Sequence, residues 1–168
     1  MPAELLILRL IHILGGVFWV GAALFSAFFL GPALAKMGPA AGQVMAGMQQ
    51  RKLFVWLPAV ALLTILSGLR LMMIVSGGDP HWFQHRVGHA YAVAGACAIL
   101  AFLLGMLVGR PAMVKAAKLG QSAASDPTSK QLIAAEVAKL QKRSGMSSMA
   151  ATILLLLAAA GMAIARYL

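Results

Sequence analysis

Two histidines of this chain lie inside long apolar segments, and they are the clearest sign of chemistry in the sequence. His12 falls in the apolar run Leu10–Gly21, and His89 falls in a comparable place on a later apolar segment. At about 1.5 Å of rise per helical residue, His12 counted from Pro2 and His89 counted from Pro80 each lie roughly 14 Å along a helix. A polar ring at that depth in an apolar interior is costly without a partner. A haem iron between two helices takes one imidazole from each, so we expect His12 and His89 to bind one haem b.

The residues that follow His12 favour the same interpretation. Gly15 and Gly16 lie one turn along the same helix, where the absence of side chains would let a flat porphyrin approach. Trp19 falls on the face of His12 at a spacing of seven residues and could wall the macrocycle. We therefore include Gly16 and Trp19 among the expected cofactor-binding residues.

Three arginines lie near the two histidines. Arg9 precedes His12 by three residues and Arg86 precedes His89 by three, so each lies one helical turn from its histidine. Arg70 is near the corresponding end of the second apolar segment. Three guanidinium groups at one level could neutralise the haem propionates. Alternatively each arginine extends separately to the interface with water, which is the better interpretation of Arg70 alone.

A row of histidines precedes and includes His89. His81, His85 and His89 are spaced by four residues, so on one helix they would share a face. Such a row could bind a divalent metal ion, with copper as the candidate. The nearby acid Asp79 is better placed as a helix cap, so no carboxylate completes the site. Alternatively, His81 and His85 lie at the interface and hydrogen-bond to water, lipid headgroups or the propionates.

The composition indicates an integral membrane protein. The 168 residues are 61% hydrophobic and 11% charged, whereas a soluble domain has roughly 25% charged residues. The net charge of +10 does not indicate nucleic-acid binding, because most basic residues lie between apolar runs. The single cysteine, Cys97, excludes an intrachain disulfide. There is no phosphate loop and no Ser–His–Asp arrangement, which argues against a hydrolase.

The apolar runs predict one all-α domain over residues 1–168, an up-down bundle of four membrane-spanning helices. Gly31-Pro32 should end the first helix, Asp79-Pro80 should begin the third, and Gly109-Arg110-Pro111 should end it. The expected spans are residues 3–30, 53–75, 80–108 and 146–167.

The charges between the spans predict the topology. The first and third connections carry most of the basic residues, so both should be cytoplasmic and both termini should lie on the outer side. The membrane that we expect is a bacterial inner membrane, in which the outer side is periplasmic. Residues 129–143 of the third connection predict a basic amphipathic helix on the membrane surface. Its apolar side would consist of Leu132, Ile133, Val137 and Leu140.

Several motifs resemble a known superfamily. The run His12-x-x-Gly-x-x-Phe-Trp-x-Gly21, then Arg51-Lys-Leu, Pro58 and Leu66-Ser-Gly-Leu69, is similar to copper-resistance D-type membrane proteins and to HemJ-type membrane protoporphyrinogen oxidases. The resemblance covers about the first 110 residues. In the HemJ-type family it implies a b-type haem held by a first-span histidine, matched by His12, and by a third-span lysine. That lysine position falls at His89, which implies a bis-histidine haem in this chain and questions the oxidase activity. The copper-resistance relatives imply copper uptake across the inner membrane.

These observations lead to three functional hypotheses. The first is a b-type haem protein in electron transfer, or a membrane haem oxidoreductase, whose redox partner would be a quinone, a porphyrinogen or superoxide. The second is copper handling through the His81, His85 and His89 face. The third is a structural subunit of a membrane complex, in which the histidines are simply packed. Lipid is the expected surroundings in each case, and a homo-oligomer is compatible with all three.

Overall fold

The computed structural model describes residues 3–123 and 130–168, and within these ranges the chain is helical with no strand. The elements in order are α1 Ala3–Phe25, the π-helical turn η1 Ser26–Leu30, α2 Gly31–Lys36, the 3-10 turn η2 Gly38–Ala40, α3 Ala41–Gln50, α4 Leu53–Ser76, the 3-10 turn η3 Pro80–Gln84, α5 Arg86–Leu104, the π-helical turn η4 Gly105–Gly109, α6 Arg110–Ala123 and α7 Lys130–Ala165.

Four helical stretches of the described chain are long and apolar enough to cross a membrane. They are Ala3–Lys36, Leu53–Ser76, Arg86–Gly120 and Ile133–Ala165. Their surfaces carry large exposed apolar side chains such as Leu14, Val17, Phe29, Leu107 and Ile164. Apolar faces of this kind suit contact with lipid acyl chains, so the chain is a multi-pass membrane protein.

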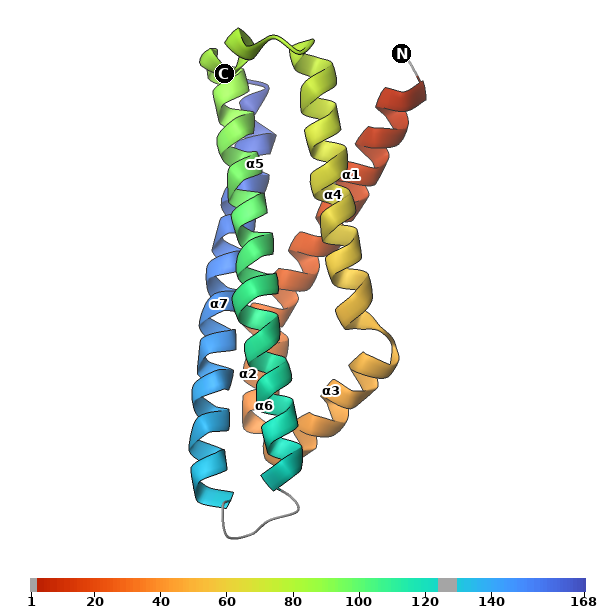
Figure 1. Cartoon of the computed structure of the whole chain (residues 1–168). Coiled ribbons are helices and arrows are strands. Elements are labelled where there is room, and N and C mark those ends of the chain that lie inside the picture. The colour runs from red at the N-terminus through yellow and green to blue at the C-terminus, as the bar shows by residue number, and fades with distance from the viewer. Residues whose placement is uncertain (1–2, 124–129) are drawn as a thin grey trace.

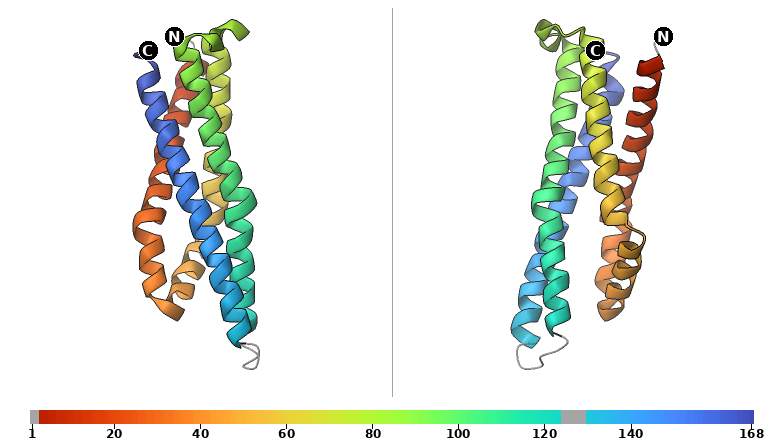
Figure 2. Two further views of the ribbon diagram at one scale, coloured as in Figure 1. Left: turned by 90° about the vertical axis from the view of Figure 1, so that its left-hand side faces the viewer. Right: turned by 45° about the vertical axis from the view of Figure 1, so that its right-hand side comes forward.

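The four stretches alternate in direction. The N-terminal end of α1, the connection from α4 to α5 and the C-terminal end of α7 lie at one end of the molecule (Figure 1). The short helices α2 and α3 and the start of α7 lie toward the other end. α5 and α6 run beside α7, while α1 crosses obliquely and packs mainly on α4 (Figure 2).

The core lies where the four stretches meet. Trp19 of α1, Ala61 of α4, Ala101 of α5 and Leu155 of α7 form one buried cluster. The Trp19 ring meets the edge of Phe102 at a centroid separation of 6.3 Å. Small side chains dominate elsewhere between helices, because lipid supplies no hydrophobic drive and close backbone approach must supply the packing. Thus α5 and α7 approach where Gly161 faces Ala94.

Two proline sites that should end helices instead follow π-helical turns within the described helices. The first helix continues through Gly31-Pro32 to Lys36, and the third continues through Arg110-Pro111 into α6. Proline lacks an N–H and its ring crowds the carbonyl four residues earlier. The π-helical turn before each proline accommodates its ring. In these turns the N–H of Gly31 donates to the Ser26 carbonyl, and that of Arg110 donates to the Gly105 carbonyl. The predicted ends at residues 30 and 108 are therefore wrong.

The expected amphipathic helix exists, but the membrane-surface interpretation of it is wrong. It is the first part of α7, continuous with the last span. Leu140 is buried against Ala112 and Ala116 of α6, with Val137 packed beside them. Because these residues pack on α6, they are not available to insert into the surface of a membrane. Residue 129 lies outside the described residues, as do the surroundings of the Leu132 side chain.

The third helix also begins later than expected. Residues 76–79 form the predicted turn, with Gly77 in the left-handed conformation at the end of α4. Asp79 caps the following segment as predicted, since its Oδ1 accepts from the His81 N–H at 2.9 Å. That segment is the 3-10 turn η3, and α5 starts at Arg86. The expected start at Pro80 is therefore wrong by six residues, which changes the position of every histidine in the region.

Candidate functional site

His12 is held against α4 by its ring. The imidazole is half-buried, and its Nδ1 lies 2.8 Å from the backbone carbonyl oxygen of Thr64. A carbonyl oxygen only accepts hydrogen bonds, so Nδ1 carries the proton and donates. The ring also lies against the bare backbone of Gly68, where an added Cβ would be 2.6 Å from the His12 Cε1. The glycine therefore makes the room that the imidazole fills.

Hydrogen bonds within α4 fix the carbonyl that His12 uses. The Thr64 hydroxyl donates to the Val60 carbonyl at 2.8 Å, and the Ser67 hydroxyl donates to the Leu63 carbonyl at 2.7 Å. Ser67 also lies 3.0 Å from the Thr64 carbonyl oxygen, so that oxygen faces both Ser67 and His12. Thr64 and Ser67 are buried, and these hydrogen bonds within α4 satisfy their hydroxyl groups.

The tautomer of His12 determines what the ring can do. With the proton on Nδ1, the neutral imidazole has its lone pair on Nε2. Metal-ligating histidines commonly donate their other ring N–H to a carbonyl or a carboxylate, which orients the ring and fixes the tautomer. His12 has that arrangement through Thr64. Its Nε2 can therefore serve as a ligand or as a hydrogen-bond acceptor.

The other α1 residues expected at the cofactor are engaged in helix packing. A Cβ at Gly15 would collide with the Thr64 hydroxyl oxygen, and one at Gly16 would meet the Thr64 methyl at 3.8 Å. Gly15 therefore leaves room for α4, and Gly16 is in ordinary contact with it. Trp19 is buried in the four-helix core against Phe102.

His89 lies in the first turn of α5, and its side chain is exposed. It is the fourth residue of that helix, about 4.5 Å along it, whereas His12 is the tenth residue of α1, about 13.5 Å along. The 3-10 turn before α5 runs across the end of the molecule rather than extending the helix (Figure 1). The equal distances expected from Pro2 and Pro80 are therefore wrong.

The histidine row is broken. His81 lies in the 3-10 turn, and His85 has an extended backbone with φ −76° and ψ 150°. Only His89 is on α5, so the three do not share the face of one helix, and that expectation is wrong. Across the described residues, no group of three or more His, Cys, Asp and Glu side chains gathers as a metal site.

The three arginines have different surroundings. Arg70 forms an ion pair with Glu4, with Nη2 2.7 Å and Nε 2.9 Å from the same carboxylate oxygen. Both side chains are about half exposed. The pair links α1 to α4 near the end of the molecule that holds the N-terminus. Arg9 and Arg86 are exposed, each one turn from its histidine as expected.

Sequence reasoning missed the α4 side of the site. The Thr64 carbonyl and Gly68 contact His12, Ser67 donates to the same carbonyl, and Glu4 pairs with Arg70. A signal was present, since Thr64 and Ser67 are polar residues three apart in an otherwise apolar span, followed at once by a glycine. That pattern marks a helix face meeting a polar partner.

Comparisons of the chain with protein-family models, with curated proteins and with solved structures find no match. The resemblance to the copper-resistance D-type and HemJ-type families therefore rests on the short motifs alone and stays a prediction.

Proposed function

We propose that this multi-pass membrane protein binds b-type haem, with the Nε2 of His12 as an axial ligand, and acts in electron transfer. The observation that carries the proposal is the 2.8 Å hydrogen bond from His12 Nδ1 to the Thr64 carbonyl. It fixes the tautomer and the ring orientation that an iron-ligating histidine needs.

His89 is the proposed second axial ligand, with Arg9 and Arg86 as the side chains that would neutralise propionates. Their helices α1 and α5 both have their N-terminal ends at the same end of the molecule, and both arginines are outside the Glu4 pair that engages Arg70. Because α5 begins at Arg86, His89 lies near the N-terminal end of that helix. His12 and His89 are therefore tested by separate variants.

A haem held by His12 and His89 would supply one-electron transfer chemistry. The contribution of this chain is to hold the ligating ring. The Thr64 carbonyl, which also accepts a hydrogen bond from Ser67, accepts from the His12 Nδ1, and the absence of a side chain at Gly68 leaves room for the imidazole. A quinone, a porphyrinogen or superoxide is the proposed class of redox partner.

The proposed location is a bacterial inner membrane, in an up-down bundle with both termini periplasmic. Support comes from charge, because the end of the molecule that holds α2, α3, α6 and the start of α7 carries most of the cations. Those cations are Lys36, Arg51, Lys52, Arg110, Lys115, Lys118, Lys130, Lys139, Lys142 and Arg143. The α6–α7 hairpin would then be the cytoplasmic segment. A reporter fused after Leu168 tests this: alkaline phosphatase should be active, and a fluorescent reporter that matures only in the cytoplasm should be dark.

A reduced-minus-oxidised spectrum of the protein purified in detergent tests the haem. Wild type should give a low-spin b-type spectrum, and His12→Ala should abolish it. Loss in His89→Ala as well supports the bis-histidine site, whereas retention there identifies a different second ligand. His85→Ala is the matched control, being an exposed histidine of the same region. A colourless wild type that binds copper would favour metal handling, and one that binds neither would favour a structural subunit.

A further inference from the structure

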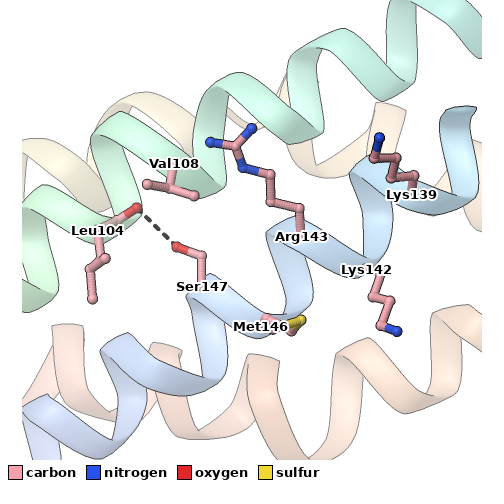
Figure 3. Close-up of a pocket in the computed structure, with 7 residues that line it drawn as sticks. All are labelled: Leu104, Val108, Lys139, Lys142, Arg143, Met146 and Ser147. Atoms are coloured by element: carbon pink, nitrogen blue, oxygen red, sulfur yellow. Dashed lines mark hydrogen bonds between the residues drawn. The ribbon is translucent and has the colours of Figure 1, made fainter.

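A second feature lies at the other end of the molecule and is independent of the haem. A groove between the η4 region and α7 is lined by Leu104, Val108, Lys139, Lys142, Arg143, Met146 and Ser147 (Figure 3). We call these seven residues the basic groove. Its α7 residues fall at spacings of three and four, so they form one helix face. The floor is apolar and the rim is cationic.

Hydrogen bonds from α7 fix the shape of the basic groove. The Ser147 hydroxyl donates to the Leu104 carbonyl at 2.9 Å, and the Ser144 hydroxyl donates to the Gly109 carbonyl at 3.2 Å. These two carbonyls lie at the two ends of the π-helical turn η4. A Cβ at Gly109 would lie 3.4 Å from the Ser147 hydroxyl oxygen, so α7 is in close contact with the turn here. The groove is thus a built feature of a widened turn, and such turns frequently occur at functional sites.

The cations of the groove have no acidic partner among the described residues. Glu136, the acid of α7, pairs with Lys115 at 3.7 Å. Glu4 pairs with Arg70, and Asp79 caps η3 at the opposite end of the molecule. Lys139, Lys142 and Arg143 are exposed side chains. Three cations on one helix face, with no acidic partner among the described residues, favour an anionic ligand.

The sequence of α7 places the groove at a membrane boundary. Arg143 is the last charged residue before the apolar stretch that begins at Met146 and continues to Ala165. Figure 3 shows Arg143 extending from α7 toward the helix that carries Val108, with Lys139 on the same side of α7 and Lys142 pointing away from both. A ligand in the groove would meet cations at one end and apolar side chains at the other. This order matches an amphiphile whose anionic headgroup faces water.

We propose that the basic groove binds an anionic phospholipid. Lys139 and Arg143 contact its phosphate, Lys142 adds positive charge at the rim, and one acyl chain lies along Leu104, Val108 and Met146. A zwitterionic lipid matches the groove less well, because its ammonium group would approach the same cations. Such a lipid would bridge α7 and the π-helical turn η4 that joins α5 to α6.

Native mass spectrometry of the full chain in detergent tests the proposal, with dioleoyl phosphatidylglycerol and dioleoyl phosphatidylcholine as probes. Wild type should retain the phosphatidylglycerol preferentially. At about 1 kcal/mol per cation, the variant K139Q/K142Q/R143Q should bind it about a hundredfold more weakly. The matched control, K36Q/R51Q/K52N, removes three cations from the same end of the molecule outside the groove and should bind like wild type. Asn is used at position 52 because Lys52 has a φ of 56°.

A second variant separates the groove from general surface charge. Val108→Phe keeps all three cations and fills the apolar floor, so it should also lower retention of the phosphatidylglycerol. Equal loss in the groove and control charge variants would overturn the proposal, as would wild-type binding by Val108→Phe. Equal retention of the two lipids by wild type would also overturn it. Circular dichroism of each variant checks that the helices are intact.

Discussion

A methyl group at Gly68 would test directly how His12 is held on α4. An ideal Cβ there would lie 2.6 Å from the His12 Cε1 and 2.9 Å from its Nδ1. Real carbon atoms do not approach so closely, and a planar ring has no flexible end that could move aside. Gly68→Ala must therefore displace the imidazole or push α1 away from α4. Either movement breaks the hydrogen bond to the Thr64 carbonyl.

The size of the effect follows from three contributions. Alanine in place of glycine inside a helix stabilises by about 1 kcal/mol. Losing the His12 hydrogen bond costs about 1 kcal/mol, and overpacking costs about 2 kcal/mol. Gly68→Ala should therefore destabilise the protein by about 2 kcal/mol. When His12→Ala has already removed the ring, only the helix contribution remains, so the same change should stabilise by about 1 kcal/mol.

The assay is unfolding in mixed micelles, followed by far-ultraviolet circular dichroism, for both single variants and the double variant. The expected coupling between the positions is about 3 kcal/mol. Gly21→Ala is the matched control, because it lies on α1 with no atom within 4 Å of the added Cβ. It should show the helix contribution alone. An equal effect of Gly68→Ala with and without the His12 ring would refute the reasoning.

Three further predictions use the same unfolding assay. Gly15→Ala should destabilise by about 2 kcal/mol, because its Cβ meets the Thr64 hydroxyl, and Thr64→Ala should relieve most of this; persistence of the full effect would contradict it. Ser147→Ala should cost about 1 kcal/mol and increase amide hydrogen exchange in η4, and unchanged exchange would show that the serine does not hold that turn. Gly161→Leu should cost about 2 kcal/mol or more, because even a Cβ would lie 3.1 Å from Ala94, and a neutral result would mean that α5 and α7 do not pack there.

The number of spanning helices could be predicted from the sequence, but their ends could not. A membrane-spanning segment must be a long apolar helix, because lipid offers its backbone no hydrogen bonds. The four spans can therefore be recognised from the long apolar runs of the sequence. Proline and glycine are the signals for helix ends, and they fail at Gly31-Pro32 and Arg110-Pro111 because each pair is preceded by a π-helical turn. Nothing in the local sequence separates a proline that ends a helix from one accommodated by a widened turn. The pattern around Pro80 fails differently, since Asp79 caps a 3-10 turn there.

The candidate site is predictable on the α1 side and not on the α4 side. His12 stands out because an imidazole in an apolar run needs a partner, and the structure supplies one in the Thr64 carbonyl. A backbone carbonyl has no sequence signature, so the partner depends on how two apolar helices are rotated against each other. Gly15 and Trp19 face inward as expected, but they face protein. Gly68 leaves room for the His12 ring, as Gly15 was expected to leave room for a porphyrin.

The positions of the two proposed sites make them separable in one protein. His12 and its α4 partners lie toward the end that holds the N-terminus, while the basic groove lies where η4 meets α7, toward the other end (Figure 1). The hydroxyl groups of Thr64 and Ser67 bond to carbonyls of α4 itself, whereas those of Ser144 and Ser147 bond across to the two ends of η4. Removing the groove cations should therefore leave a haem spectrum unchanged, and removing His12 should leave phospholipid retention unchanged. If His12→Ala abolished both, the two ends would share one cooperative packing, and the four-helix core at Trp19 is the structure that would connect them.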